Sequence, residues 1–163
     1  MNSKGFTLLE LLIVVAIVAI LATVAVPNFG PLVSTNRMDT IQDRLVTSLS
    51  QARSEAIRQG VDVQLCPRSS VNTVVNSCGT SWQNGWLVIA NGTGLRVEDS
   101  IATSLTLTGA SVTFSSDGAT TSNASICFTV DDGDDSTDTR YIQISRFGRI
   151  KAWDSDGDVI CGS

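Results

Sequence analysis

One carboxylate interrupts the apolar N-terminal stretch of this sequence, and its position makes it the first candidate for a chemical role. Glu10 follows Lys4-Gly5-Phe6-Thr7-Leu8-Leu9 and precedes the stretch 11–22, which contains only Leu, Ile, Val and Ala. A carboxylate near the membrane-embedded end of a helix costs about 2–3 kcal/mol or more and usually marks function. Glu10 therefore needs a partner.

The sequence contains no histidine, which is the commonest general base and the usual zinc ligand. Every Ser/His/Asp or Cys/His nucleophile arrangement is thereby excluded. The two lysines, Lys4 and Lys151, add little that could form a catalytic site. We therefore expect neither enzymatic activity nor a cofactor.

The cysteines are even in number and show no CxxC spacing, which favours disulfides over metal binding. They are Cys66, Cys78, Cys127 and Cys161, all after the apolar segment. Cys66 and Cys78 bracket a polar loop, while Cys161 lies where a bond to Cys127 would tie down the chain end. We favour Cys66–Cys78 and Cys127–Cys161, but four cysteines permit three pairings, and the other two stay open. Oxidised cysteines place this part of the chain outside the cytosol.

Two acidic clusters suggest calcium, but the second departs from the spacing of an EF-hand loop. Their members are Asp131, Asp132, Asp134, Asp135 and Asp138 in the first, and Asp154, Asp156 and Asp158 in the second. The second cluster has its glycine at position four rather than six and ends before a glutamate at twelve. A solvated acidic loop is favoured, since turns also require Asp and Gly. We expect no metal site, with the second cluster as a weak calcium candidate.

A small basic cluster occupies the C-terminal third of the chain. Arg149 and Lys151 alternate, which predicts that both lie on one face of a strand, and Phe147-Gly148 forms a turn that aims Arg146 alongside. The net charge of the whole chain is −5, which argues against a general nucleic-acid-binding surface. Any DNA contact through Arg146, Arg149 and Lys151 would be local.

Two helices are predicted before the cysteines. Residues 8–26 contain only Glu10 and Thr23 as polar residues, and this length is close to the roughly 20 residues that span a bilayer. We predict a transmembrane or filament helix over 6–30. Pro27, Gly30 and Pro31 follow its apolar run and form either a flexible joint or an ordinary loop. An amphipathic helix over 31–59 follows, and its apolar stripe should pack on the globular head that the rest of the chain forms. The stripe consists of Met38, Ile41, Leu45, Leu49, Ala52 and Ala56.

Beyond Gly60 the apolar period changes to two, which predicts a β-rich head over 60–163. The expected strands are 61–65, 86–90, 111–115, 125–130, 141–145 and 149–153. Turn dipeptides separate them at 84–85, 91–92, 117–118, 132–133 and 156–157. At 163 residues the chain has room for one such head. The predicted fold is α+β, with a long N-terminal helix packed against an antiparallel sheet or pair of sheets.

The stretch Lys4-Gly5-Phe6-Thr7-Leu8-Leu9-Glu10 resembles the class III signal of type IV pilins and type II secretion pseudopilins. The resemblance implies a pilin-like fold with residues 1–5 as a leader. Prepilin peptidase would cleave this leader between Gly5 and Phe6, after which the new Phe6 amine is methylated. It also implies that Glu10 pairs with the N-terminal amine of a neighbouring subunit during assembly.

Motifs of the head resemble the FimT/FimU and GspH group of minor pilins and pseudopilins. They are Ala52-Arg53-Ser54-Glu55-Ala56, Leu65-Cys66-Pro67, Trp82-Gln83-Asn84-Gly85-Trp86-Leu87-Val88 and Gly148-Arg149-Ile150. FimT-like pilins bind DNA through a Gly-Arg-x-Arg motif, which here reads Gly148-Arg149-Ile150-Lys151. For the Trp82 and Trp86 pair, a role as core anchors is favoured over ligand contact.

The resemblance implies a minor structural subunit that helps prime assembly of a type IV pilus and joins the filament. The expected partners are prepilin peptidase, other minor pilins and the major pilin. The expected location is the inner membrane, as a single-pass protein with a periplasmic head, and then a pilus or pseudopilus. DNA-binding pilin for natural transformation and minor pseudopilin of type II secretion are the two alternatives.

Overall fold

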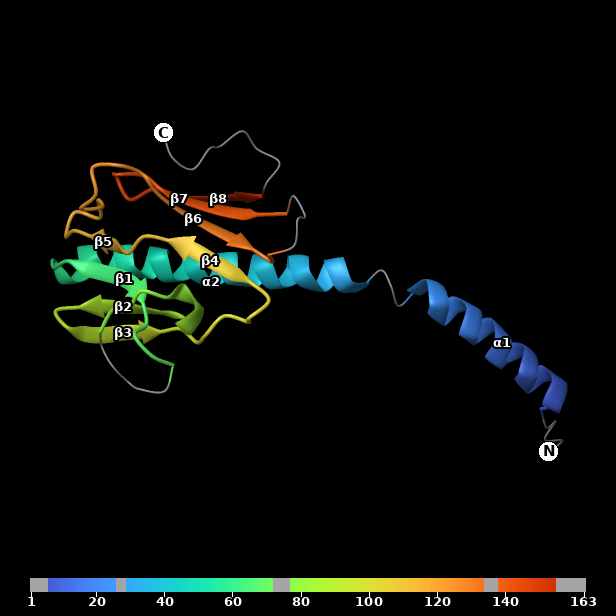
Figure 1. Cartoon of the computed structure of the whole chain (residues 1–163). Coiled ribbons are helices and arrows are strands. Elements are labelled where there is room, and N and C mark those ends of the chain that lie inside the picture. The colour runs from blue at the N-terminus through green and yellow to red at the C-terminus, as the bar shows by residue number, and fades with distance from the viewer. Residues whose placement is uncertain (1–5, 26–28, 72–76, 134–137, 155–163) are drawn as a thin grey trace, which may run out of the picture. The chain divides into compact units, whose positions relative to one another are not determined.

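The computed structural model describes residues 6–25, 29–71, 77–133 and 138–154 (Figure 1). The chain divides into two compact units, Met1–Asn36 and Arg37–Ser163. The first contains helix α1, Leu8–Ala25, and the first turns of helix α2, Phe29–Gln59. Nowhere in the described residues is there a helix with both the length and the apolar content needed to cross a membrane.

Helix α2 buries the apolar stripe that its sequence predicts. All six stripe residues, from Met38 to Ala56, are at most 5% exposed, which confirms their role in packing. The helix ends at Gln59, where the N–H of Gly60 donates to the carbonyl of Ala56 at 2.9 Å. Gly30 and Pro31 lie within its first turn, where proline is tolerated, so they belong to the helix rather than to a joint. Pro27 lies outside the described residues.

The head contains two four-stranded sheets, and every pair of neighbouring strands is antiparallel. The first has the order β3-β2-β1-β5, and its strands are Val63–Pro67 (β1), Trp86–Ala90 (β2), Thr93–Val97 (β3) and Val112–Phe114 (β5). The second has the order β4-β6-β7-β8, with Thr106–Gly109 (β4), Ile126–Asp131 (β6), Arg140–Ile144 (β7) and Ile150–Asp154 (β8). A short 3-10 helix, η2, covers Trp82–Asn84. The predicted α+β class is confirmed.

Six of these strands correspond to predicted ones, and β3 and β4 do not. β3 follows β2 through Asn91 and Gly92, whose φ angles of 49° and 74° are those of a type I′ hairpin turn. Its side chains alternate between exposed and half-buried, so it lacks the buried apolar face from which a strand is recognised. In β4 only Leu107 is buried.

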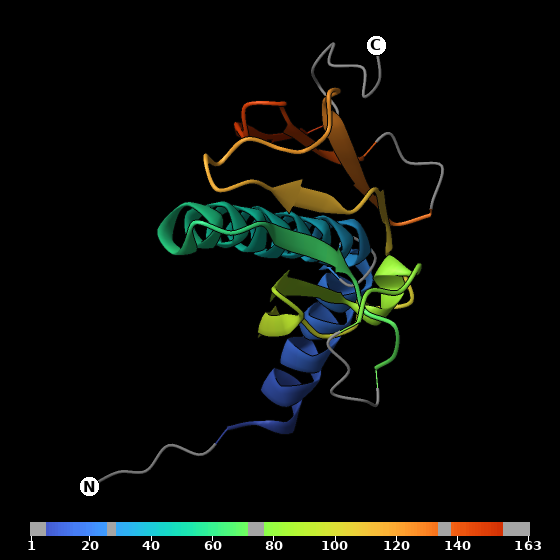
Figure 2. The same ribbon diagram turned by 90° about the vertical axis from the view of Figure 1, so that its left-hand side faces the viewer.

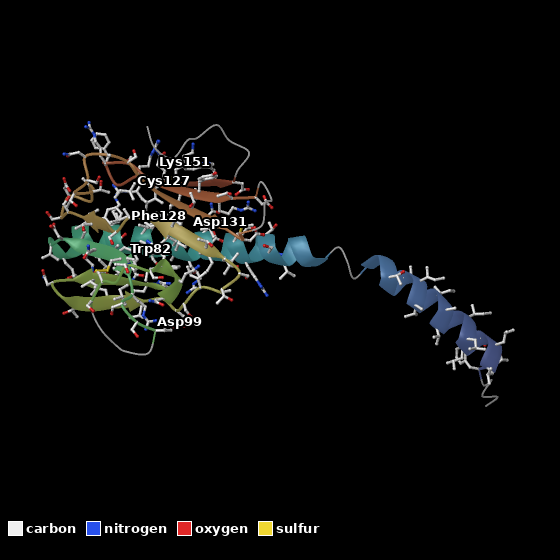
Figure 3. All side chains as sticks on the ribbon, viewed as in Figure 1. Trp82, Asp99, Cys127, Phe128, Asp131 and Lys151 are labelled. Carbon is white, nitrogen blue, oxygen red and sulfur yellow. A yellow bond between two sulfur atoms is a disulfide. The ribbon has the colours of Figure 1, made fainter. Side chains whose placement is uncertain are left out.

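Helix α2 supplies the centre of the hydrophobic core, and in both views β2–β3 and β6–β8 lie on opposite sides of it (Figures 1 and 2). Trp82 of η2, which lies between β1 and β2 of the first sheet, contacts two strands of the second sheet. Its Nε1 donates to the carbonyl of Gly109 at 2.8 Å, and its ring meets Phe128 edge-on at 5.1 Å (Figure 3). Trp86 is fully buried. Both tryptophans are therefore the core anchors that their sequence context predicts.

Candidate functional site

Helix α1 begins with a polar cap. Thr7 precedes its first residue, and Thr7 Oγ1 accepts a hydrogen bond from the N–H of Glu10 at 3.2 Å. The carbonyl of Thr7 accepts another from the N–H of Leu11 at 3.2 Å. Such an N-cap satisfies donors that a helix start leaves unpaired. The Thr-x-x-Glu spacing is a signal for this role of Thr7, which was not among the predictions above.

The rest of α1 is an exposed apolar surface. Those of its large hydrophobic side chains that the structure describes range from 50% exposed at Val14 to 76% at Leu8, and Phe6 just before the helix is 81% exposed. Soluble monomers rarely expose contiguous apolar patches larger than a few hundred Å². We therefore expect other molecules to cover this surface.

Glu10 is the only acidic residue in the first turn of α1, and the last turn contains no basic residue. An anionic group near a helix N-terminus is favoured by the helix dipole, and the described part of the chain places no basic side chain against it. Gly5 lies outside the described residues, so cleavage between Gly5 and Phe6, methylation of Phe6 and pairing of Glu10 stay predictions.

The predicted basic cluster lies at the hairpin between β7 and β8. The N–H of Gly148 donates to the carbonyl of Ser145 at 2.8 Å, and the N–H of Ser145 donates to the carbonyl of Arg149 at 3.0 Å. Arg146 and Arg149 are exposed there, and the guanidinium of Arg146 lies 4.5 Å from the ring centroid of Phe147. The hairpin therefore presents two arginines and an exposed aromatic ring together.

Lys151 is the cluster member that lies within β8. β8 begins at Ile150, one residue later than predicted, so Arg149 directly precedes the strand. That Arg149 and Lys151 share a face stays a prediction. The ammonium of Lys151 lies 5.5 Å from the ring centroid of Trp153, which stacks on Tyr141 at 5.9 Å. The three cations are thus divided between the turn and the strand.

Gly148 is required at this hairpin for two structural reasons. Its φ of 73° is unfavourable for residues with a side chain, and an added Cβ would collide with the carbonyl oxygen of Gly118. Arg53 of α2 braces the same place, because its guanidinium donates to Gly118 O at 2.9 Å and to Phe147 O at 3.3 Å. Gly148 of the predicted motif thus has a role in shaping the turn.

One residue from each predicted acidic cluster, Asp138 and Asp154, lies against a buried arginine, Arg140. Arg140, which is 4% exposed, lies 2.6 Å from Asp39, 3.3 Å from Asp138 and 3.4 Å from Asp154. Burial alone would lower the pKa of Arg140, but its hydrogen bonds to Asp39 and Asp138 raise that pKa above the ordinary value. The sequence gives no signal for this cluster, because its members come from α2, β7, β8 and a loop.

The described residues of the two acidic clusters also bear on the calcium hypothesis. Asp154, one of the weak calcium candidates, is turned to Arg140, and the carboxylate of Asp131 accepts the N–H of Gly133 at 3.1 Å. The other two candidates, Asp156 and Asp158, lie outside the described residues, as do Asp134 and Asp135. Within the described ranges no three acidic, cysteine or histidine side chains are grouped to hold a metal.

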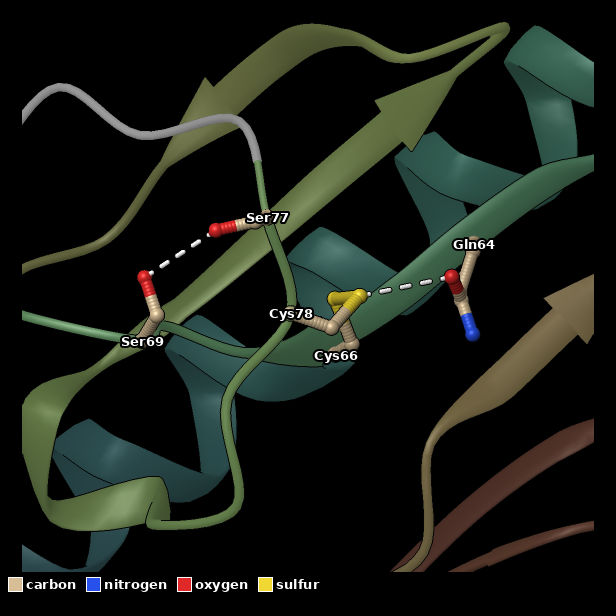
Figure 4. Close-up of a disulfide and its surroundings, with 5 residues drawn as sticks. All are labelled: Gln64, Cys66, Ser69, Ser77 and Cys78. Carbon is tan, nitrogen blue, oxygen red and sulfur yellow. Dashed lines mark hydrogen bonds between the residues drawn. A yellow bond between two sulfur atoms is a disulfide. The ribbon is translucent and has the colours of Figure 1, made fainter.

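The predicted Cys66–Cys78 disulfide is present, with a Cα–Cα distance of 5.5 Å (Figure 4). It joins β1 to the loop before η2, where the hydroxyl groups of Ser69 and Ser77 lie 3.2 Å apart. Gln64 Oε1 lies 3.3 Å from the sulfur of Cys78, a contact that involves no proton, since a disulfide sulfur carries none. Cys127 lies in β6, whereas Cys161 lies outside the described residues, so their pairing stays a prediction (Figure 3).

Solved structures share this fold. The type IV minor pilin FimU of Pseudomonas aeruginosa matches with a TM-score of 0.61 and 23% identity, covering 75% of this chain and 92% of FimU. A second crystal form of FimU gives a TM-score of 0.58. The minor pseudopilin EpsH from the type 2 secretion system of Vibrio cholerae matches with a TM-score of 0.54 and 10% identity, covering 74% and 99% of the two chains.

Sequence comparisons find matches for separate parts of the chain. The type IV wide pilus major component PilA4 of Thermus thermophilus is 74% identical over 27 residues, which are 17% of this chain and 21% of PilA4. The match thus spans about a fifth of that relative. Residues 1–26 match the prokaryotic N-terminal methylation motif, and residues 42–148, more than half of the chain, match the model of the type II transport protein GspH. This chain is therefore a member of the GspH family, with the N-terminal methylation motif of pilins and pseudopilins.

Proposed function

We propose that this chain is a minor type IV pilus subunit that helps prime pilus assembly and is then incorporated into the filament. The observation that carries the proposal is helix α1, whose described large apolar side chains are at least 50% exposed and whose first turn carries a carboxylate, Glu10. In a filament, equivalent helices of neighbouring subunits cover such a surface. The likeness of a 27-residue stretch to PilA4, a pilus component, supports the same function.

Processing precedes assembly in this proposal. Prepilin peptidase removes residues 1–5 on the cytoplasmic side of the inner membrane, and the new Phe6 amine is methylated. The precursor is held by its N-terminal helix as a single-pass protein with the head in the periplasm. The Cys66–Cys78 disulfide supports this placement, because disulfides persist in oxidising compartments. Major pilin and other minor pilins are the partners in the filament.

Glu10 provides the test of this proposal. Glu10→Gln keeps the size of the side chain but removes the charge that the Phe6 amine of a neighbour would meet in an apolar filament core. We expect the variant to be made and processed, but to fall about tenfold or more in the sheared pilus fraction on immunoblots. Glu55→Gln, which alters a carboxylate on α2, is the matched control and should be incorporated normally. Wild-type incorporation of Glu10→Gln would contradict the proposed role.

Two other functions use the same fold. A minor pseudopilin of type II secretion agrees with the GspH family and with the likeness to EpsH. In that case deletion of the gene would block protein secretion and leave pilus number unchanged, whereas the pilus proposal expects the reverse. The second alternative is a DNA-binding pilin for natural transformation. The observation that supports it is the exposure of Arg146, Phe147 and Arg149 at one hairpin.

A further inference from the structure

A groove of about 350 Å³ opens beside the part of α2 that begins the head. Its other wall is the segment between β3 and β4, which returns alongside α2 (Figure 1). Arg37 and Arg44 of α2 and Ser100 of the opposite segment lie on its walls, while Ile41 and Leu105, at most 5% exposed, contribute apolar surface. All these residues belong to the head unit, Arg37–Ser163.

The two arginines of the groove differ in what they already bind. Arg44 donates to Glu98 Oε2 at 2.9 and 2.7 Å and lies 5.3 Å from the ring of Trp86. Arg37 has no hydrogen bond or ion pair with any described residue. The nearest carboxylate along its own helix, Asp39, is paired with Arg140 at 2.6 Å. Arg37 therefore offers the groove a charge that nothing in the described chain neutralises.

The wider surroundings of the groove also carry an excess of positive charge. Glu98 lies between Arg44 and Arg96, at 2.7 and 2.6 Å, and Asp99 lies 3.8 Å from Arg68. Together with Arg37 there are four arginines against two carboxylates here, although the net charge of the chain is −5. Such local positive potential in an acidic protein favours an anionic group of a partner.

The size and lining of the groove narrow the kind of partner. A volume of about 350 Å³ is at the small end of ligand pockets and suits one or two side chains. Ile41 and Leu105 would contact an aliphatic stem, while the guanidinium of Arg37 binds a carboxylate through charge-assisted hydrogen bonds. A glutamate side chain has both parts. The groove residues also begin at Arg37, directly after the N-terminal unit Met1–Asn36, whose apolar helix α1 needs neighbouring subunits to cover it.

We propose that this groove receives an acidic side chain, a glutamate or an aspartate, from a neighbouring pilin subunit, and that Arg37 binds its carboxylate. The inference rests on the proposed function, because it requires neighbouring subunits in a filament. It adds a contact made by the head to the contact that Glu10 makes in the N-terminal helix. Opposite charges at this second place fix the partner and the register of the subunits.

The test uses the full-length chain in the cells that make the filament. Arg37→Glu should lower the amount in sheared filaments about tenfold or more, since like charges would then meet across the interface. Ser100→Glu, which puts a carboxylate on the opposite wall, should have the same effect. Arg37→Lys should retain most incorporation, and Arg58→Glu, a charge reversal at an exposed position 21 residues further along α2, should match the wild type.

A photo-crosslinking amino acid at Ala102, which also lines the groove, identifies the occupant. We expect a crosslink to another pilin subunit that is lost in Arg37→Glu and retained in Arg37→Lys. Wild-type incorporation of both Arg37→Glu and Ser100→Glu would overturn the inference, as would a crosslink to no pilin. Absence of the wild-type chain from filaments would instead overturn the proposed function, so the two failures are distinguishable.

Discussion

At the scale of single residues, arginines join helix α2 to both sheets of the head. Arg140 of β7 reaches Asp39 of α2, and Arg44 of α2 reaches Glu98 beyond β3. Gln42 adds an uncharged link, because its Nε2 donates to the carbonyls of Tyr141 and Trp153 at 3.1 and 3.2 Å. A buried charge that loses its partner is strongly destabilising, so these contacts restrict how the sheets dock on the helix.

Glu98 is the acidic residue whose ionisation should matter most for stability. Burial by itself raises the pKa of Glu98, but the hydrogen bonds from Arg44 and Arg96 outweigh burial and place the pKa below its ordinary value. The folded state therefore binds the Glu98 proton less readily than the unfolded chain does. The resulting stabilisation is present above the unfolded pKa, about 4.3, and is lost as pH falls through the lower folded value.

We predict that Glu98→Gln lowers the free energy of unfolding of the head by about 2 kcal/mol at pH 7, because Arg44 and Arg96 lose a charged acceptor. The difference from the wild type should shrink as pH falls below the unfolded pKa of about 4.3, and disappear once pH is below the lower folded pKa. Urea unfolding of the fragment from Asn28 onward, at a series of pH values, measures both. Asp43→Asn, an exposed change on α2, is the control. A loss that does not depend on pH would contradict the assigned ionisation.

At the scale of elements, the parts of the fold that have a repeating burial pattern were predictable. The stripe of α2 recurs at three and four residues, and all of it is buried, so both the helix and its inner face were predictable. Strand β3 has no buried side chain, and β4 has one, so neither strand has an alternating pattern of buried apolar residues in its sequence. The cluster around Arg140 could not be predicted, because residues 39, 138 and 154 come together only through the tertiary fold.

The Cys66–Cys78 disulfide fastens the loop before η2 to β1 across a sequence separation of 12 residues. A closure of this length constrains the unfolded chain by about 3 kcal/mol on the entropic model. We predict that replacing Cys66 and Cys78 together by serine lowers the unfolding free energy of the head by about that amount, measured in urea. Peptide mapping of the oxidised protein checks the pairing in the same preparation and should also find Cys127 joined to Cys161. Mixed pairings would contradict both predictions.

At the scale of the whole molecule, charge decides between assembly and DNA capture. The chain carries a net charge of −5, and its exposed C-terminal cations are only Arg146, Arg149 and Lys151 in the described region. Asp154 ends β8, the strand that contains Lys151, and its carboxylate is paired with Arg140. Three cations neutralise few phosphates, so they support a salt slope of at most about 2–3.

We therefore predict that labelled double-stranded DNA binds the head fragment from Asn28 onward weakly at low salt and hardly at physiological salt. Arg149→Ala should change this residual binding little, whereas at a working phosphate site it would lower affinity about equally for unrelated sequences and reduce the salt slope by about one. Arg58→Ala, which removes an exposed arginine of α2, is the matched control for loss of charge. Strong binding at physiological salt that disappears in Arg149→Ala but not in Arg58→Ala would favour DNA capture over priming. The hairpin at Gly148, rather than helix α1, would then hold the residues that define the function.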